Sequence, residues 1–387
     1  MEKNYESEIK SAVAKYEDLL RGQLERVERI NASSGETDYS SLDKLIIGVC
    51  GGDGIGPIIC KAARDILADL LADEIKSGKI ELRDINGLTI ENRIACGKAI
   101  PDDTLAELKE CHVILKGPTT TPNAGDGMPN IESANVAMRK ALDLYANVRP
   151  VRVPEKGIDW TFFRENTEGS YAVGSLGVNV TDDLALDFCV TTTEGTRRIA
   201  RRAFDYARAN GKKNVSIVTK ANVIKTTDGK FLKICREIAK DYPEISVDEW
   251  YIDIMTAKLI DEKRRTSFNV FILPNLYGDI ITDEAAEFQG GVGTAGSANI
   301  GGRYAMFEAI HGSAPRMITE GRGQYADPCS MLRATVMLLS HIGRQEAADR
   351  LEAALDKCMI TERKLVITGR DTGATCDEFA AYVRESL

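Results

Sequence analysis

The chain has 387 residues, of which 43% are hydrophobic and 28% are charged, and its formal net charge is −9. The length favours two domains, and the acidic balance argues against nucleic acid as a partner. Nine scattered cysteines without a C-x-x-C pair, and only three histidines, argue against a disulfide framework or a zinc site. No apolar run is long enough for a membrane span and no signal-like core opens the chain. We therefore expect a cytoplasmic protein with no membrane partner.

Apolar residues at helical spacing predict an N-terminal helical extension within residues 1–44. Ile9, Val13, Tyr16 and Leu20 belong to this pattern, with charged residues between them. The segment N-A-S-S-G-E-T-D after them predicts a linker. We expect the helix to pack on the body of the protein or on a second subunit.

Short apolar strands alternate with long helices from residue 45 onward. This alternation predicts an α/β fold with a mostly parallel core sheet, whose functional side chains lie at the carboxyl ends of strands. Residues 174–193 alternate around a D-D turn, which predicts an antiparallel excursion. The predicted strands are 45–50, 113–116, 215–219 and 270–273, and the predicted helices are 58–75, 193–210, 228–241 and 329–359.

Two glycine-rich segments follow predicted strands. The first, Gly51-Gly-Asp-Gly-Ile-Gly56, opens a helix. Its spacing is not G-x-G-x-x-G and no acidic residue ends a second strand at the expected distance, which argues against a dinucleotide-binding fingerprint and favours a tight turn. The second, residues 290–302, predicts a long flexible loop. Its backbone would either approach a large flat ligand or form an ordinary loop.

Segments far apart in the sequence carry groups that suit a small anionic substrate and a metal ion. Arginines hold carboxylates bidentately and stay charged, two aspartates a helical turn apart suit a hard divalent cation, and lysine and tyrosine can transfer protons. Each group taken alone also fits an ordinary salt bridge or surface side chain. The residues are Arg139, Arg149, Arg164, Tyr171, Lys220, Asp279 and Asp283.

The motifs G-D-G-I-G-P, L-K-G-P-T-T-T-P, S-A-N-V-A-M-R-K, F-R-E-N-T-E-G-S-Y, V-T-K-A-N, N-L-Y-G-D-I-I-T-D and H-G-S-A-P follow one another from about residue 45 to the C-terminus. With them the chain resembles the metal-dependent β-decarboxylating dehydrogenases, which include isocitrate, 3-isopropylmalate, homoisocitrate and tartrate dehydrogenases. The resemblance implies a two-domain isopropylmalate/isocitrate dehydrogenase-like fold that is not a Rossmann fold. It implies a large domain of residues 45–145 and 290–387, and a small domain of residues 146–289. A dimer clasp is expected at about 174–193, in a homodimer with shared active sites.

The resemblance also implies the chemistry and the residue roles. Such enzymes oxidise a 2-hydroxy acid at C2, pass hydride to NAD or NADP, and release the β-carboxylate as carbon dioxide. Arg139, Arg149 and Arg164 would bind the substrate carboxylates. Mg²⁺ or Mn²⁺ would be held by Asp253, Asp279 and Asp283, and proton transfer would fall to Tyr171 and Lys220. Lys220 and Asp253 would come from the partner subunit.

Substrate choice depends on the residues just before Arg139. Ser133 and Asn135 match the Ser-x-Asn of isocitrate dehydrogenases, whereas isopropylmalate enzymes place apolar residues here. The resemblance therefore favours isocitrate, oxidised to 2-oxoglutarate as in the tricarboxylic acid cycle. The loop between Pro122 and Ser133 is a few residues longer than usual, which leaves 3-isopropylmalate, homoisocitrate and a tartrate- or malate-type substrate open. A non-catalytic regulatory subunit is disfavoured, because the metal and proton-transfer residues are all present.

The choice between NADP and NAD rests on the residues that follow H-G-S-A-P. NAD-preferring relatives carry an aspartate where this chain has Arg316, and Arg316 or Arg322 would suit a 2′-phosphate, which favours NADP. Asp327 stands where relatives usually have asparagine, and its carboxylate would disfavour the 2′-phosphate of NADP. The residues expected at the cofactor are Lys116, Thr121, Asn135, His311, Gly312, Ser313, Ala314, Arg316 and Asp327.

Overall fold

The computed structural model describes residues 5–32, 35–122, 127, 129 and 131–387. These residues form two compact units. The larger unit comprises residues 36–151 and 283–387, and the smaller unit comprises residues 1–35 and 152–282. The predicted linker at 31–38 and the predicted long loop after Pro122 lie partly outside the described residues. Within the described part of the chain, no helix is long and apolar enough to cross a membrane.

The larger unit is built on strands in the order β2-β1-β3-β12-β11-β4. The β1, β2, β3 and β12 ladders are parallel, whereas β11 runs antiparallel to both of its neighbours. Strands β1 and β3 carry almost continuous apolar side chains because both of their faces are covered. The bounds are β1 Leu45–Cys50, β2 Ile80–Ile85, β3 Val113–Lys116, β4 Ala146–Val153, β11 Gly296–Ile300 and β12 Ala305–Ala309.

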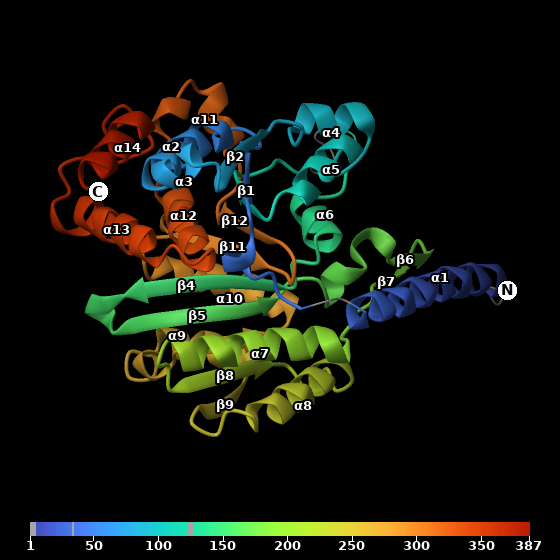
Figure 1. The fold of residues 1–387 in the computed structure, drawn as a ribbon. Coiled ribbons are helices and arrows are strands. Elements are labelled where there is room, and N and C mark those ends of the chain that lie inside the picture. Colours follow the sequence, from blue (N-terminus) through green and yellow to red (C-terminus); the bar gives the residue numbers. More distant parts are fainter. Residues whose placement is uncertain (1–4, 33–34, 123–126, 128, 130) are drawn as a thin grey trace. The chain divides into compact units, whose positions relative to one another are not determined.

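Helices cover the sheet of the larger unit (Figure 1). Helix α12 packs on β11, β12 and α2, while α14 packs on α2. Helix α6 contributes Ala134 and Met138 to a buried apolar cluster with Leu108 and Met306. The bounds are α2 Gly56–Leu70, α3 Ala72–Lys76, α4 Ile90–Cys96, α5 Asp102–Glu110, α6 Ala134–Ala141, α11 Pro315–Thr319, α12 Cys329–His341, α13 Gln345–Asp356 and α14 Cys376–Glu385.

The smaller unit contains the parallel strand order β5-β10-β8-β9. Helices α7 and α8 pack side by side on it, and the rings of Phe162 and Phe271 stack at 4.3 Å in its core. A separate antiparallel pair, β6 and β7, confirms the predicted excursion. The bounds are β5 Ile158–Glu165, β6 Val178–Thr181, β7 Leu184–Leu186, α7 Thr193–Ala209, β8 Asn214–Thr219, α8 Thr227–Ala239, β9 Ser246–Tyr251, α9 Ile252–Ile260, β10 Val270–Leu273 and α10 Asn275–Glu287, with the last residues of α10 in the larger unit.

The predicted N-terminal helix is present as α1, Glu6–Asn31. It lies beside β6 in the smaller unit (Figure 1), and the ring of Tyr16 stacks on Phe188 at 5.1 Å. Leu19 and Ile30 are buried, but Ile9 and Val13 are exposed. Only part of the predicted apolar face is therefore covered within one chain.

Three element predictions were wrong in detail. The predicted helix 58–75 begins at Gly56 and is interrupted at Leu71, between α2 and α3. The predicted helix 329–359 is two helices, because Gly343 adopts a left-handed φ of 76° between α12 and α13. The predicted flexible loop 290–302 contains the buried strand β11. Gly296 is needed there because a Cβ atom would lie 2.4 Å from the backbone nitrogen of Ala334.

Candidate active site

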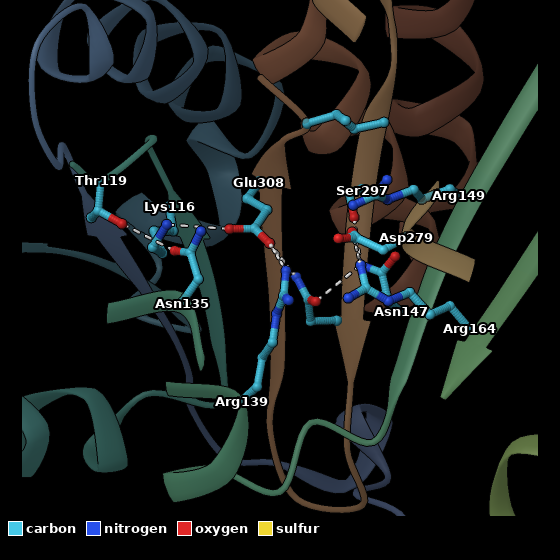
Figure 2. A network of polar contacts seen from close by, with 12 residues as sticks. Lys116, Thr119, Asn135, Arg139, Asn147, Arg149, Arg164, Asp279, Ser297 and Glu308 are labelled. Carbon is cyan, nitrogen blue, oxygen red and sulfur yellow. Dashed lines mark hydrogen bonds and ion pairs between the residues drawn. The ribbon is translucent and has the colours of Figure 1, made fainter. Parts of the chain in front are cut away.

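The sequence-predicted residues fall into two groups, one in each compact unit. In the larger unit the central feature is the buried carboxylate of Glu308, on β12. It receives Lys116 Nζ at 3.2 Å and Arg139 Nη2 at 3.3 Å (Figure 2). The Lys116 side chain is fully buried and also donates to the carbonyl of Gly117 at 3.0 Å. Lys116, expected at the cofactor, thus has a buried carboxylate as its immediate partner.

Burial opposes the charge of Glu308, but the two cations outweigh it. Desolvation raises the pKa of this carboxyl, whereas Lys116 and Arg139 lower it, and the net effect is a pKa of about 2. Asn299 Nδ2 donates a further hydrogen bond at 2.7 Å. Glu308 is therefore ionised at neutral pH, and it holds Arg139 at the end of α6.

Polar side chains on β4 and β11 hold this carboxylate in place. Asn147 on β4 donates through Nδ2 to Ser297 Oγ at 2.8 Å and to Asn299 Oδ1 at 3.0 Å. Because Asn299 Oδ1 accepts this bond, its amide nitrogen faces Glu308. The buried amides thus fix the orientation of one another and of the carboxylate.

The remaining substrate-side residues of the larger unit lie on α6 and β4. Arg149 Nη1 pairs with Asp283 Oδ1 at 3.0 Å. Asn135 accepts a hydrogen bond from Thr119 Oγ1 at 3.1 Å (Figure 2). Ser133 immediately precedes α6, and its hydroxyl does not cap the helix. Arg139 is nearly buried, and its Nε has no hydrogen-bond partner among the described residues. A buried unsatisfied donor of a charged group is costly, so this position suits an anionic acceptor.

In the smaller unit, Arg164 at the end of β5 is held by the N-terminal turns of α10. Its Nε and Nη2 donate to Asn275 Oδ1 at 2.9 and 2.6 Å. Its Nη1 pairs with Asp279, which lies beside it in Figure 2. Tyr171 donates its hydroxyl to the other oxygen of Asp279 at 2.8 Å. The structure thus brings together Arg164 and Tyr171, from one predicted motif, and Asp279, from another.

Gly278 allows this close approach. A Cβ atom at this position would lie 2.6 Å from both Cβ and Cγ of Arg164. No side chain fits at that separation, so α10 can press against the buried stem of Arg164 only through a glycine. The glycine of N-L-Y-G-D is therefore part of the arrangement that orients the guanidinium group.

Lys220 and Asp253 form a second pair in the smaller unit. Lys220 follows β8, Asp253 lies in the first turn of α9, and Nζ is 2.6 Å from Oδ1. This hydrogen bond lowers the pKa of Asp253. Asp228 Oδ2 accepts from the backbone nitrogen of Lys220 at 2.7 Å and fixes the turn. One chain therefore pairs these two residues with each other.

Ser313, one of the residues predicted at the cofactor, lies in a loop of the larger unit that is hydrogen-bonded to neighbouring loops. Asp53, in the first glycine segment, accepts from the backbone nitrogens of Ile90 and Thr120, each at 2.7 Å. Ser313 accepts from the nitrogen of Ile55 at 3.0 Å, and its hydroxyl lies 2.7 Å from that of Thr120. Gly54 has a φ of 57°, and a Cβ atom there would lie 2.0 Å from the carbonyl oxygen of Ser313. The first glycine segment is thus the predicted tight turn, and its glycines serve loop packing.

The other predicted cofactor residues lie nearby in sequence and are more exposed. Ala314 adopts a left-handed φ of 44° at the start of α11. His311 and Gly312 precede it, with Nδ1 of His311 2.9 Å from the carbonyl of Gly312. Thr121 is exposed.

The arginines in and after α11 form ion pairs within the chain. Arg316 Nε pairs with Glu320 at 2.5 Å, and Arg322 pairs with the same carboxylate and donates to the carbonyl of Gly369 at 2.6 Å. Asp327 accepts from the backbone nitrogen of Cys329, the first residue of α12, at 2.8 Å. An incoming phosphate would have to compete with Glu320 for either arginine.

The predicted metal ligands fit a hard divalent cation by their chemistry. Asp279 and Asp283 are four residues apart on α10, which places them one helical turn apart. Both are carboxylates, the donors that Mg²⁺ and Mn²⁺ prefer, and both are partly exposed. Among the residues that the structure describes, no three acidic, histidine or cysteine side chains gather as a metal-binding group. One chain therefore offers two of the three predicted ligands on one helix.

The sequence did not lead us to the residues that orient the predicted site residues through hydrogen bonds and ion pairs. Glu308 had a signal, since it is a lone acid in an otherwise apolar strand, A-M-F-E-A-I. Asn275 lies within a quoted motif but had no assigned role. The contact of Arg26 with Glu168 at 3.1 Å joins residues 142 positions apart, and no local pattern marks it.

Comparison with known proteins identifies this arrangement. Residues 46–383 match the family model described as "Isocitrate/isopropylmalate dehydrogenase". The chain belongs to this family. A similar solved structure is the crystal structure of isocitrate dehydrogenase from Methylococcus capsulatus, whose sequence is 35% identical to this chain. The TM-score is 0.76, and the match covers 88% of this chain and 99% of that chain.

Curated relatives of the isocitrate/isopropylmalate dehydrogenase family differ in substrate. Homoisocitrate dehydrogenase of Methanocaldococcus jannaschii is 36% identical, over 88% of this chain and 98% of its own length. Isocitrate dehydrogenase [NADP] of Rickettsia prowazekii is 38% identical over 80% of this chain, and the match spans 62% of that relative's length. The chain is thus an oxidoreductase of this family with the predicted α/β fold, and family members generally use a divalent metal and NAD(P).

Proposed function

We propose that this chain catalyses the oxidative decarboxylation of isocitrate to 2-oxoglutarate and carbon dioxide, with NADP as the preferred cofactor over NAD. The observation that supports the substrate is the polar end of α6. Ser133 and Asn135 precede Arg139 there, and no apolar side chain stands at these two positions. A polar pocket of this kind favours a carboxylate over an isopropyl group, because buried polar groups left unpaired cost binding energy.

The chain's own residues account for substrate binding and proton transfer. Arg139, Arg149 and Arg164 would hold the three carboxylates. Asp283 and Asp279 orient Arg149 and Arg164, whereas the buried Glu308 would stay in place beside Arg139 and leave its Nε for the substrate. Lys220 would assist removal of the C2 hydroxyl proton during oxidation, and its Nζ can accept that proton only as the neutral amine. The Tyr171 hydroxyl would then deliver a proton to C3 after the carboxylate leaves.

A divalent cation would be held by Asp279 and Asp283, with Asp253 as the third ligand. When bound, Mg²⁺ or Mn²⁺ supplies Lewis-acid polarisation at the C2 oxygen and stabilises the negative charge that develops on decarboxylation. We propose that Asp253 and Lys220 come from a second copy of the chain, so that the enzyme acts as a homodimer. The nine free cysteines support a reducing compartment, in line with a cytoplasmic enzyme.

Homoisocitrate is the second candidate substrate. The relative from Methanocaldococcus jannaschii, matched over nearly its whole length, carries that name. The two substrates differ by one methylene group, a difference worth roughly 10- to 200-fold in kcat/KM. Either substrate would use the same three arginines.

A matrix of substrates and cofactors tests the proposal. Purified protein with Mn²⁺ is given isocitrate, homoisocitrate, 3-isopropylmalate, tartrate or malate, each with NADP⁺ or NAD⁺, and reduction is followed at 340 nm. Isocitrate should give the highest kcat/KM, by roughly tenfold or more over homoisocitrate. A higher kcat/KM for homoisocitrate would assign the second candidate. Inactivity with every pair, alongside an intact fold by circular dichroism, would refute a catalytic role.

A further inference from the structure

Helix α1 lies outside the part of the chain that matches the family model, residues 46–383, yet it contacts the loop that carries Tyr171. Arg26 Nη1 pairs with Glu168 Oε1 at 3.1 Å, and Nη2 donates to Thr167 Oγ1 at 3.0 Å. The side chain of Arg26 is 18% exposed and that of Glu168 is 3% exposed. The pair is therefore shielded from water. In such a place the attraction between opposite charges is strong, and removing one partner is costly.

Glu168 is the centre of a built carboxylate site. Its Oε2 accepts from the backbone nitrogen of Thr192 at 2.8 Å, and its Oε1 accepts from the hydroxyl of the same residue. Gly195 leaves room for it, since a Cβ atom there would lie 2.3 Å from Oε1. Glu165, also buried, accepts from the backbone nitrogen of Glu168 at 2.6 Å. Two carboxyl groups are thus buried close together, and Arg26 brings positive charge to one of them.

The same turn reaches the reacting residues by two routes. The backbone carbonyl of Glu168 accepts from Asn275 Nδ2 at 3.1 Å, and the other end of that amide accepts from Arg164. One residue on, Gly169 exchanges backbone hydrogen bonds with Val190 at 2.8 and 3.2 Å. The turn Ser170–Ala172 follows directly and presents Tyr171 to Asp279.

We propose that Arg26 is a positioning residue for the dehydrogenase reaction, which fixes the turn Glu165–Tyr171 and thereby aims the Arg164 guanidinium group and the Tyr171 hydroxyl. The inference rests on the proposed function, because these two groups matter only if they bind and protonate the substrate. The N-terminal extension then has a catalytic purpose in addition to its packing.

A purely structural attachment of α1 would behave differently. Helix α1 is also held by the stacked rings of Tyr16 and Phe188 and by buried Leu19 and Ile30. Loss of Arg26 would then lower stability and leave turnover of the folded enzyme unchanged. A positioning role predicts slower turnover at temperatures where the variant is fully folded, since a displacement of about 1 Å can cost roughly 100-fold in rate.

The test compares Arg26→Met, Arg26→Lys and Arg29→Met in the full chain. Arg29 is an exposed arginine three residues further along α1, so Arg29→Met removes the same charge from the same helix without touching Glu168. For Arg26→Met we expect kcat/KM to fall roughly 10- to 100-fold, mainly through kcat. Arg29→Met should stay within about twofold of the parent. Arg26→Lys keeps the charge, loses the two-pronged donor geometry, and should fall between them.

Two further readouts separate the outcomes. Amide hydrogen exchange of peptides covering residues 165–172 should accelerate in Arg26→Met and not in Arg29→Met. A fourth variant, Arg26→Ala, leaves space for a small cation, and guanidinium ion at millimolar concentration should restore part of its activity by binding where the Arg26 side chain was. Unchanged kcat/KM and unchanged exchange in Arg26→Met would overturn the inference. If the parent enzyme reduces neither cofactor with any substrate, the proposed function fails, while the exchange comparison still decides whether Arg26 orders the turn. If Arg26→Met does not fold, the comparison of Arg26→Lys with Arg29→Met decides.

Discussion

Replacing Glu308 by glutamine would leave the buried Lys116 ammonium group without its anion. The side chain keeps its shape and can still accept from Asn299, so the change removes charge and little else. Lys116 has no exposed side-chain surface, and neutralising one partner of a buried ion pair costs about 3–5 kcal/mol. The depression of the Glu308 pKa from 4.5 to about 2 gives a similar figure of about 3 kcal/mol, at about 1.4 kcal/mol per pKa unit.

The assay has to report on the larger unit, because both tryptophans, Trp160 and Trp250, lie in the smaller one. Native-state hydrogen exchange of the strands β3 and β12, which carry Lys116 and Glu308, gives the local opening free energy directly. We expect this free energy to fall by about 3 kcal/mol in Glu308→Gln at pH 7. The matched control is Glu110→Gln, the same substitution in an exposed pair with Arg83, where the loss should stay under about 1 kcal/mol.

The pH dependence of the parent protein gives an independent check. Because the pKa of Glu308 is lowered by folding, its contribution is present above pH 4.5 and is lost as the pH falls toward 2. Glu308→Gln should lack this contribution at every pH. A loss in Glu308→Gln no larger than that of Glu110→Gln would refute the reasoning, because it would mean that the charge of Lys116 needs no anion.

Three other outcomes are expected. Gly278→Ala should force Arg164 to move, raise the KM for the substrate and lower stability by roughly 1–3 kcal/mol, which steady-state kinetics and thermal unfolding would show together; normal KM and stability would contradict the 2.6 Å approach. Tyr171→Phe should lower kcat roughly 100- to 10,000-fold with little change in substrate affinity; a kcat near the parent's would remove the tyrosine from proton transfer. Burial and the charge of Glu168 raise the pKa of Glu165 to about 7, so its contribution to stability is present below pH 4.5 and is lost as the pH rises through 7. The melting temperature should decline over this range, and Glu165→Gln should flatten the decline. An unchanged decline in this variant would show that another group causes it.

The strands were predictable because their signals are local. Residues 45–50, 113–116 and 270–273 are short apolar runs, and the structure places β1, β3 and β10 at these bounds. The interruption at Gly343 was missed because one glycine in a helical pattern does not show whether it adopts a positive φ. The strand β11 was missed because its glycine and small residues resemble a loop, and only the close approach of α12 gives Gly296 its purpose.

The site residues were predicted from motifs. The structure shows why the residues that hold them in place could not be predicted in the same way. Tyr171, Arg164 and Asp279 converge because β5 and α10 are adjacent in space, although their motifs are more than 100 residues apart. Supporting contacts such as that between Arg26 and Glu168 depend on tertiary packing alone. Asp253 and Lys220 pair within one chain, so their predicted role in a partner's site remains a prediction.

The glycines of this chain differ sharply in how much alteration they would tolerate. Residues 290–302 look like a natural place to insert an epitope tag or a fluorescent label. Gly296, however, is the first residue of β11 and packs directly on α12, so an insertion there would interrupt the sheet. The turn at Gly211 is the better choice, because it is exposed and no atom lies within 4 Å of a Cβ built there. The glycine itself has a left-handed φ of 63°, so it is kept and the insertion is placed beside it. Gly78 has the same open surroundings in the larger unit, and its left-handed φ of 79° likewise requires that the glycine be kept. A pair of dyes at these two turns would let the distance between the two units be followed in solution during turnover.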